Sequence, residues 1–153
     1  MSESLQPLAV LLSQNERLRD AALVEHQRVR VASEAAAAQA AQLLAYRHDY
    51  EQRWQTQFRQ AAQIEVLRHY QSFMERLTQA VEQQARIAEH AHAQVERALV
   101  ALRNTEVRCA SVRKLIERRT HEQRSRTDRL DQKRSDELAS RAAWDHPNAP
   151  GRR

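Results

Sequence analysis

The chain has 153 residues, of which 29% are charged and only 5% aromatic, and its formal net charge is +5. With one glycine and three prolines it has no glycine-rich phosphate loop, and its seven histidines never stand four residues apart as in a helical metal site. A catalytic, cofactor or metal site is therefore not expected, and the chain is predicted not to be an enzyme. Residues 8–146 contain neither glycine nor proline, the two residues that most often end helices. We expect an all-α protein built from long helices.

The first predicted helix covers about residues 8–57 and has a weak heptad pattern. Steps of seven from the first leucine of this helix meet apolar residues at most positions: Leu8, Asn15, Ala22, Val29, Ala36, Leu43 and Tyr50. A second, softer set lies between them: Leu11, Leu18, Glu25, Ala32, Gln39 and Tyr46. Together the two sets predict one apolar seam along this helix.

The second predicted helix covers about residues 66–143 and has the clearer seam. Every seventh residue is apolar in the series Met74, Val81, Ala88, Val95, Leu102, Cys109 and Ile116. The intervening positions are mostly small or apolar until the last one: Leu77, Gln84, Ala91, Ala98, Thr105, Val112 and Arg119. We therefore expect the seam to fade after about Ile116. Cys109 lies in the seam and is interpreted as a small buried apolar residue, not as a nucleophile.

The two seams match when the chain folds back on itself, because paired positions in antiparallel helices have numbers with a constant sum. A sum of 124 pairs Tyr50 with Met74, and a sum of 123 pairs the intervening sets. Both sums place a turn at about residues 58–65, so residues 1–143 are predicted to form a single antiparallel coiled-coil hairpin. No glycine or proline marks this turn, and an extended dimer with one long helix per chain stays open as the alternative.

The second helix is expected to continue beyond its partner, because Leu8 already pairs with Ile116. The remainder, to about residue 143, is dense in both signs of charge and is predicted to protrude as a lone helix supported by pairs such as Glu137 with Arg141. Its charges are interpreted either as a solvated face or as a docking element for an acidic or polar surface. Residues 144–153 are predicted to be a flexible tail.

The positive net charge permits nucleic-acid binding, but acidic residues are interspersed with the basic ones throughout. There is no helix-turn-helix, zinc-finger or aromatic platform, so no nucleic-acid partner is expected. The apolar run at residues 8–12 is too short for a signal peptide, and no stretch reaches the length of a membrane span. The chain is predicted to be cytoplasmic and without a transmembrane segment.

The sequence from Arg129 to Ala143, RLDQKRSDELASRAA, closely resembles the ending of the flagellar export family FliJ. Residues on both sides of the predicted turn resemble the patch with which this family contacts the export gate: Gln39, Leu43, Tyr46, Tyr50, Phe73, Leu77, Ala80 and Gln84. On each helix they follow steps of four, three and four, and every mirrored pair sums to 123. The family more often has histidine at the position of Gln84. A gate-binding patch must be exposed, whereas the heptad pattern places several of these residues in the seam, among them Leu43, Tyr46, Tyr50 and Leu77.

The resemblance implies a soluble stalk of the flagellar type III protein export apparatus, which docks in the ring of the export ATPase FliI, promotes ring assembly and does not itself hydrolyse ATP. It also implies contact of the hairpin tip with the gate protein FlhA, export chaperones as further partners, and a peripheral place at the inner face of the cell membrane. We expect the ring contact to use basic residues of the second helix: Arg118, Arg119, Arg124, Arg126, Arg129, Lys133 and Arg134. The stalk protein of a virulence type III secretion system stays open as an alternative. From another class, so does a generic coiled-coil scaffold or basic nucleic-acid-associated protein.

Overall fold

The computed structural model describes residues 5–58 and 63–145, and within them the chain is the expected all-α helical hairpin. Helix α1 spans Gln6–Arg53, a short π-helical turn, η1, spans Trp54–Phe58, and helix α2 spans Ile64–Asp145. The centre of the predicted turn, residues 59–62, lies outside the described residues. So does most of the predicted tail, of which residues 144 and 145 belong to α2.

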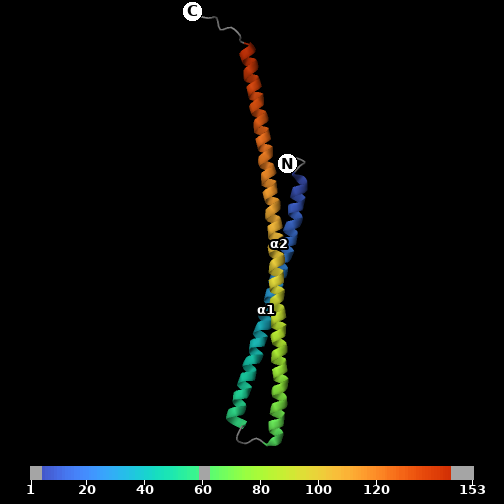
Figure 1. Ribbon diagram of the computed structural model, residues 1–153, viewed down its shortest axis with the longest axis vertical. Coiled ribbons are helices and arrows are strands. Elements are labelled where there is room, and N and C mark those ends of the chain that lie inside the picture. Colours follow the sequence, from blue (N-terminus) through green and yellow to red (C-terminus); the bar gives the residue numbers. More distant parts are fainter. Residues whose placement is uncertain (1–4, 59–62, 146–153) are drawn as a thin grey trace, which may run out of the picture. The chain divides into compact units, whose positions relative to one another are not determined.

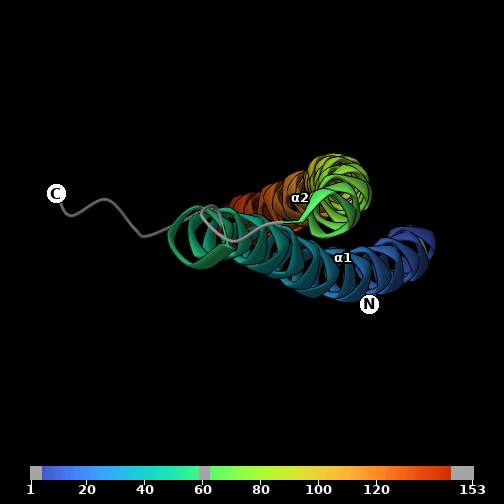
Figure 2. The same ribbon diagram turned by 90° about the horizontal axis from the view of Figure 1, so that it is seen from below.

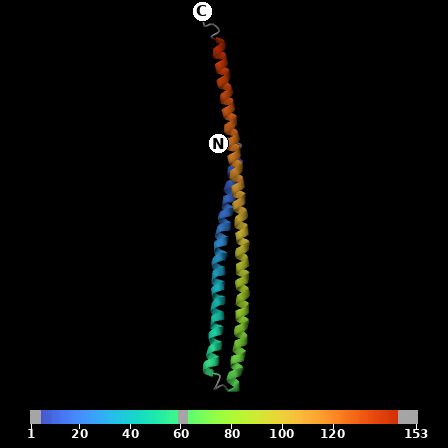
Figure 3. The ribbon, with the colours of Figure 1, turned by 60° about the vertical axis from the view of Figure 1, so that its left-hand side comes forward.

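The chain divides into two compact units. The hairpin unit is Glu16–Val107 and contains most of α1, η1 and the first half of α2. In this unit α1 and α2 lie side by side in both Figure 1 and Figure 3. Figure 2 views it from the tip, the end at which η1 and the first turn of α2 lie. The terminal unit is formed by Met1–Asn15 and Arg108–Arg153.

Local sequence explains where α1 begins and ends. Pro7 lies in the first turn of the helix. Backbone N–H groups in the first turn have no intrahelical acceptor, so a proline there costs no helical hydrogen bond. The helix ends without glycine or proline, because its backbone passes into the wider turn of η1. There the Thr56 hydroxyl donates to the carbonyl oxygen of Gln52 at 3.0 Å. A helix end of this kind requires neither glycine nor proline, so those residues do not mark it in the sequence.

The predicted seam of α2 is confirmed in both units. In the hairpin unit Leu77 and Leu102 are buried, and the other predicted positions from 74 to 105 are half-buried. In the terminal unit Cys109 and Val112 are buried and Ile116 is half-buried. These side chains form one stripe along the helix, with the alternating steps of three and four residues that a two-helix coiled coil requires.

The predicted seam of α1 is right in its first set and wrong in its second. Members of the first set, such as Val29 and Ala36, are buried or half-buried. Every member of the second set is exposed: Leu11, Leu18, Glu25, Ala32, Gln39 and Tyr46. The half-buried positions are each one residue later: Leu12, Arg19, His26, Ser33, Ala40 and Arg47. The seam of α1 therefore advances by four and then three residues, not by three and then four.

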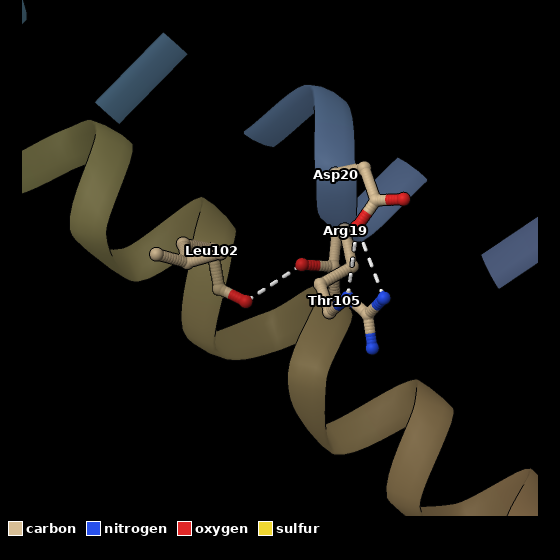
Figure 4. A network of polar contacts seen from close by, with 4 residues as sticks. All are labelled: Arg19, Asp20, Leu102 and Thr105. Carbon is tan, nitrogen blue, oxygen red and sulfur yellow. Dashed lines mark hydrogen bonds and ion pairs between the residues drawn. The ribbon is translucent and has the colours of Figure 1, made fainter. Parts of the chain in front are cut away.

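Polar side chains occupy four of these six half-buried positions, Arg19, His26, Ser33 and Arg47, which is why apolar residues alone did not reveal them. Arginine can lay its methylene groups along an apolar seam while its guanidinium stays in water. The side chain of Arg19 is only 30% exposed, and its Nη2 lies 3.0 Å from Oδ1 of Asp20 (Figure 4). Thr105, which a register sum of 124 places opposite Arg19, donates its hydroxyl to the carbonyl oxygen of Leu102 at 2.6 Å. Polar residues of this kind hide the seam from a pattern based on apolar residues alone.

In the terminal unit, burial ends in two steps. Leu8, Cys109 and Val112 are buried, and Cys109 is only 1% exposed. Half-buried residues continue past Ile116, beyond the point where the seam was expected to fade: Thr120, Gln123 and Ser125. From residue 126 to residue 145 every residue is exposed. In its own unit, this last part of α2 is a helix without a buried face.

Candidate functional site

The eight residues that resemble a gate-binding patch, here called the tip patch, all lie in the hairpin unit. Two of their four mirrored pairs are joined by a hydrogen bond or a ring contact. The Nε2 of Gln84 donates to Oε1 of Gln39 at 3.2 Å, and the ring centroids of Tyr50 and Phe73 are 4.6 Å apart. Both contacts join α1 to α2 at a register sum of 123. The fold therefore brings together residues separated by as many as 45 positions in the sequence.

Exposure differs strongly among the members of the tip patch. Gln39 and Tyr46 are exposed, the latter at 51%, whereas Leu77 is buried at 7%. The remaining members are half-buried: Leu43, Tyr50, Phe73, Ala80 and Gln84. The one-residue shift of the α1 seam places Arg47 in the seam and turns Tyr46 outward. Interpretation of Tyr46 as a seam residue was therefore wrong, whereas Leu77 is a seam residue that offers little surface to a partner.

The tip patch continues into an aromatic cluster that the sequence pattern did not predict. Tyr70 stacks on Tyr50, with centroids 5.9 Å apart and ring planes 12° from parallel, and on Trp54, at 4.0 Å and 10°. Tyr46 and Tyr50 are 6.3 Å apart. The signal for α1 and η1 was present in the sequence, because Tyr46, Tyr50 and Trp54 are four residues apart and such residues share a helix face.

The surroundings of Tyr70 favour the neutral form of its hydroxyl. Partial burial raises the pKa of the Tyr70 hydroxyl above its usual value of 10.0, and the carboxylate of Glu51 raises it further. Arg47 opposes the rise, but its Nε already lies 3.5 Å from Oε1 of Glu51 in an ion pair on α1. The rise extends to higher pH the range in which Tyr70 contributes an uncharged ring to the cluster.

A hollow of about 540 Å³, here called the tip hollow, lies between the end of α1 with η1 and the start of α2. Four rings of the aromatic cluster line it: Tyr50, Trp54, Tyr70 and Phe73. Arg53 and Arg76 also line it. The size is within the range of about 300–1,000 Å³ typical of small-ligand sites.

The seven basic residues expected to contact an ATPase ring, here called the basic set, all lie in the terminal unit and are all exposed: Arg118, Arg119, Arg124, Arg126, Arg129, Lys133 and Arg134. With a helical advance of about 100° per residue, five of them fall within an arc of about 100° on α2. Arg124 and Arg134 lie outside this arc. Glu122 lies inside it, so the face is predominantly but not uniformly basic.

Other kinds of site are not found in the described part of the chain. Residues 5–58 and 63–145 contain no group of three or more histidine, cysteine or acidic side chains placed to hold a metal ion. No helix within these residues has an apolar stretch sufficient to cross a membrane. Cys109 has a free thiol, which is buried. The candidate functional surfaces of the described residues are therefore the tip patch with its aromatic cluster and the basic set.

Comparison with known proteins bears on both surfaces. The family model of the flagellar FliJ protein matches residues 4–148, which is nearly the whole chain. The match includes the tip patch, the aromatic cluster and the basic set. No curated protein and no solved structure matches the chain significantly.

Proposed function

The chain belongs to the flagellar FliJ family, a family of flagellar type III protein export, and from this membership we propose that it is the stalk of the export apparatus. In this proposal the terminal unit docks in the ring of the export ATPase FliI and promotes its assembly. The tip patch binds the export gate protein FlhA, and export chaperones are further partners. The protein acts at the inner face of the cell membrane through these contacts and performs no catalysis of its own.

The observation that best supports a gate contact is the two-helix composition of the tip patch. Gln39 and Gln84 share a hydrogen bond, and Tyr46, about two helical turns from Gln39 on the same face of α1, presents an exposed ring. Tyrosine is favoured at protein interfaces because it combines a large rigid ring with a polar hydroxyl. A partner that binds this patch contacts α1 and α2 together and so recognises the folded hairpin.

The contact with the ATPase ring is supported by the exposure of the basic set. Its side chains lie on a helix segment that has few or no buried neighbours, so they are accessible to a partner. Exposed ion pairs are each worth only about 0–1 kcal/mol and are screened by salt. Many such contacts provide attachment that still exchanges rapidly, which suits a stalk inside a ring better than a tight apolar plug.

The test compares ATP hydrolysis and ring population of FliI with and without this protein. The full chain is expected to increase both, and a chain that ends after Ile116 is expected to lose the effect. Reversal of three charges, Arg126→Glu, Arg129→Glu and Lys133→Glu, should act like the truncation. A matched control reverses three exposed arginines of the hairpin unit: Arg68→Glu, Arg86→Glu and Arg103→Glu. Equal loss of stimulation in both triple variants would contradict a specific contact through the basic set.

A further inference from the structure

The tip hollow adjoins the tip patch but consists mostly of residues outside it. Tyr50 and Phe73 are common to both, whereas Trp54 and Tyr70 belong to the hollow alone. The near-parallel rings of Trp54 and Tyr70, 4.0 Å apart, hold one another in place from opposite helices. The first turn of α2 adds apolar surface nearby, since Ile64 is 71% exposed and Val66, which lines the hollow, is 41% exposed. The hollow therefore has an apolar, aromatic wall that is accessible from outside.

The charged residues of its lining are of one sign. Arg53 and Arg76 line the hollow together with His69, and none of its lining residues within the described chain is acidic. Neither arginine forms an ion pair with a carboxylate of the described residues. Among the described residues, the Arg76 guanidinium makes one hydrogen bond, a long one of 3.5 Å from its Nε to the carbonyl oxygen of Ser72, and its terminal nitrogens are available as donors.

The neighbouring hollow on the same unit shows the contrast. It is lined by three carboxylates, Glu51, Glu75 and Glu82, together with Arg47. There the arginine is already paired with Glu51. Charge therefore distinguishes the two hollows, and an acidic ligand is favoured only at the tip hollow.

We propose that the tip hollow is a docking pocket for a protein segment in which one aromatic side chain is flanked by Asp or Glu. The aromatic ring of the segment enters the hollow and packs against the rings that line it, where offset or edge-to-face contacts are favourable. Its flanking carboxylates pair with Arg53 and Arg76, whose planar guanidinium groups can each donate two parallel hydrogen bonds to a carboxylate. The proposal deepens the gate contact and rests on the proposed function for the identity of the partner, but its chemistry is tested without that partner.

The chain contains a matched pair of reporters for this test. It has two tryptophans, Trp54 in the tip hollow and Trp144 in the terminal unit, where it is 82% exposed. Incorporation of 5-fluorotryptophan into the full chain gives two fluorine NMR signals, which the substitution Trp144→Phe assigns. The probes are three short peptides at millimolar concentration: acetyl-Asp-Phe-Asp-amide, acetyl-Lys-Phe-Lys-amide and acetyl-Asp-Ala-Asp-amide.

The Asp-Phe-Asp probe is expected to shift the Trp54 signal saturably and to leave the Trp144 signal in place. The other two probes should bind at least tenfold more weakly, because one lacks the carboxylates and the other lacks the ring. The double variant Arg53→Gln and Arg76→Gln should lose the preference for the acidic probe. The control Arg68→Gln changes an exposed arginine of α2 that does not line the hollow, and should retain the preference. Equal shifts for the acidic and basic probes, or equal shifts of both tryptophan signals, would overturn the proposal.

The FlhA cytoplasmic domain distinguishes failure of this proposal from failure of the gate contact. If FlhA binds the protein and the Asp-Phe-Asp peptide competes with it, both proposals are supported. If FlhA binds and the peptide neither shifts Trp54 nor competes, the pocket proposal is wrong and the gate contact stands. If FlhA does not bind but the peptide shifts Trp54 saturably, the gate contact is wrong and the pocket takes its aromatic segment from another protein.

Discussion

Truncation of Tyr46 and of Leu77 to alanine separates binding from packing in the tip patch. Leu77 is 7% exposed, so Leu77→Ala removes a buried side chain from the seam between α1 and α2. Such truncations cost about 2–5 kcal/mol, and we expect about 2–3 kcal/mol because a two-helix seam is open to solvent on both sides and leaves little enclosed cavity. For a chain of this size that lowers Tm by about 4–12 °C. Tyr46 is 51% exposed, and Tyr46→Ala should cost about 1 kcal/mol or less.

Binding should show the opposite order for these two variants. An exposed tyrosine at the centre of an interface is a typical hot spot, so Tyr46→Ala should weaken FlhA binding about tenfold or more while the helical circular dichroism at 222 nm stays near that of the wild type. Leu77→Ala should lower Tm and weaken binding only as far as the hairpin loses structure. Thermal melts and calorimetric titration on the same preparations measure both effects. A Tm loss for Tyr46→Ala as large as that for Leu77→Ala would place Tyr46 in the seam and refute the shifted register.

Three further predictions concern stability. Arg19→Leu should raise Tm by the equivalent of about 1 kcal/mol, because Arg19 occupies the seam, whereas Leu18→Arg on the exposed neighbouring position should change Tm little; the opposite order would restore the register predicted from apolar residues. Cys109, at 1% exposure, should react with a thiol reagent only on unfolding, and Cys109→Ser should cost about 1–3 kcal/mol in a urea melt; rapid labelling of the folded chain would contradict its burial. The pKa of Tyr70 is raised in the fold, so the contribution of its neutral hydroxyl to stability is complete below pH 10.0 and is lost as pH rises through the folded pKa. In thermal melts from pH 8 to pH 11, Tm should therefore fall more steeply for the wild type than for Tyr70→Phe.

Periodicity predicted the antiparallel hairpin because the seam of α2 is made largely of side chains whose polarity matches their burial. Leu77, Leu102 and Val112 are apolar and buried, so their spacing alone located the stripe. The sum of 124 followed for the first seam set. The Gln39–Gln84 hydrogen bond has the predicted sum of 123, but the half-buried residues of α1, one position later, match the intervening set of α2 at a sum of 124. The match required no information about the turn, which has no marker residue in the sequence.

The same method failed where polarity and burial disagree. Arg19 and Arg47 are half-buried although they are charged, and Leu18 is exposed although it is apolar. The aromatic cluster was missed for a different reason, because Trp54 lies in η1, where the regular α-helical step has already ended. Stacking of Trp54 on Tyr70 depends on how the chain returns from the turn, and the heptad pattern has no information about that return.

Along most of this chain, different residues serve folding and the proposed binding, whereas at the tip the same residues serve both. In the hairpin unit, small seam residues such as Ala36 and Ala88 permit close packing but present nothing to a partner. The residues of the basic set are charged and exposed, so they contribute little to packing. Tyr50 and Phe73 differ from both, because their rings contact one another across the two helices while each stays only half-buried. The contact between these two rings therefore stabilises the packing of α1 on α2, and their exposed parts remain available to a partner. A partner that binds these rings only when they are packed together has a higher affinity for the packed tip than for an opened one. Its binding must therefore stabilise the packed tip by that difference in binding free energy.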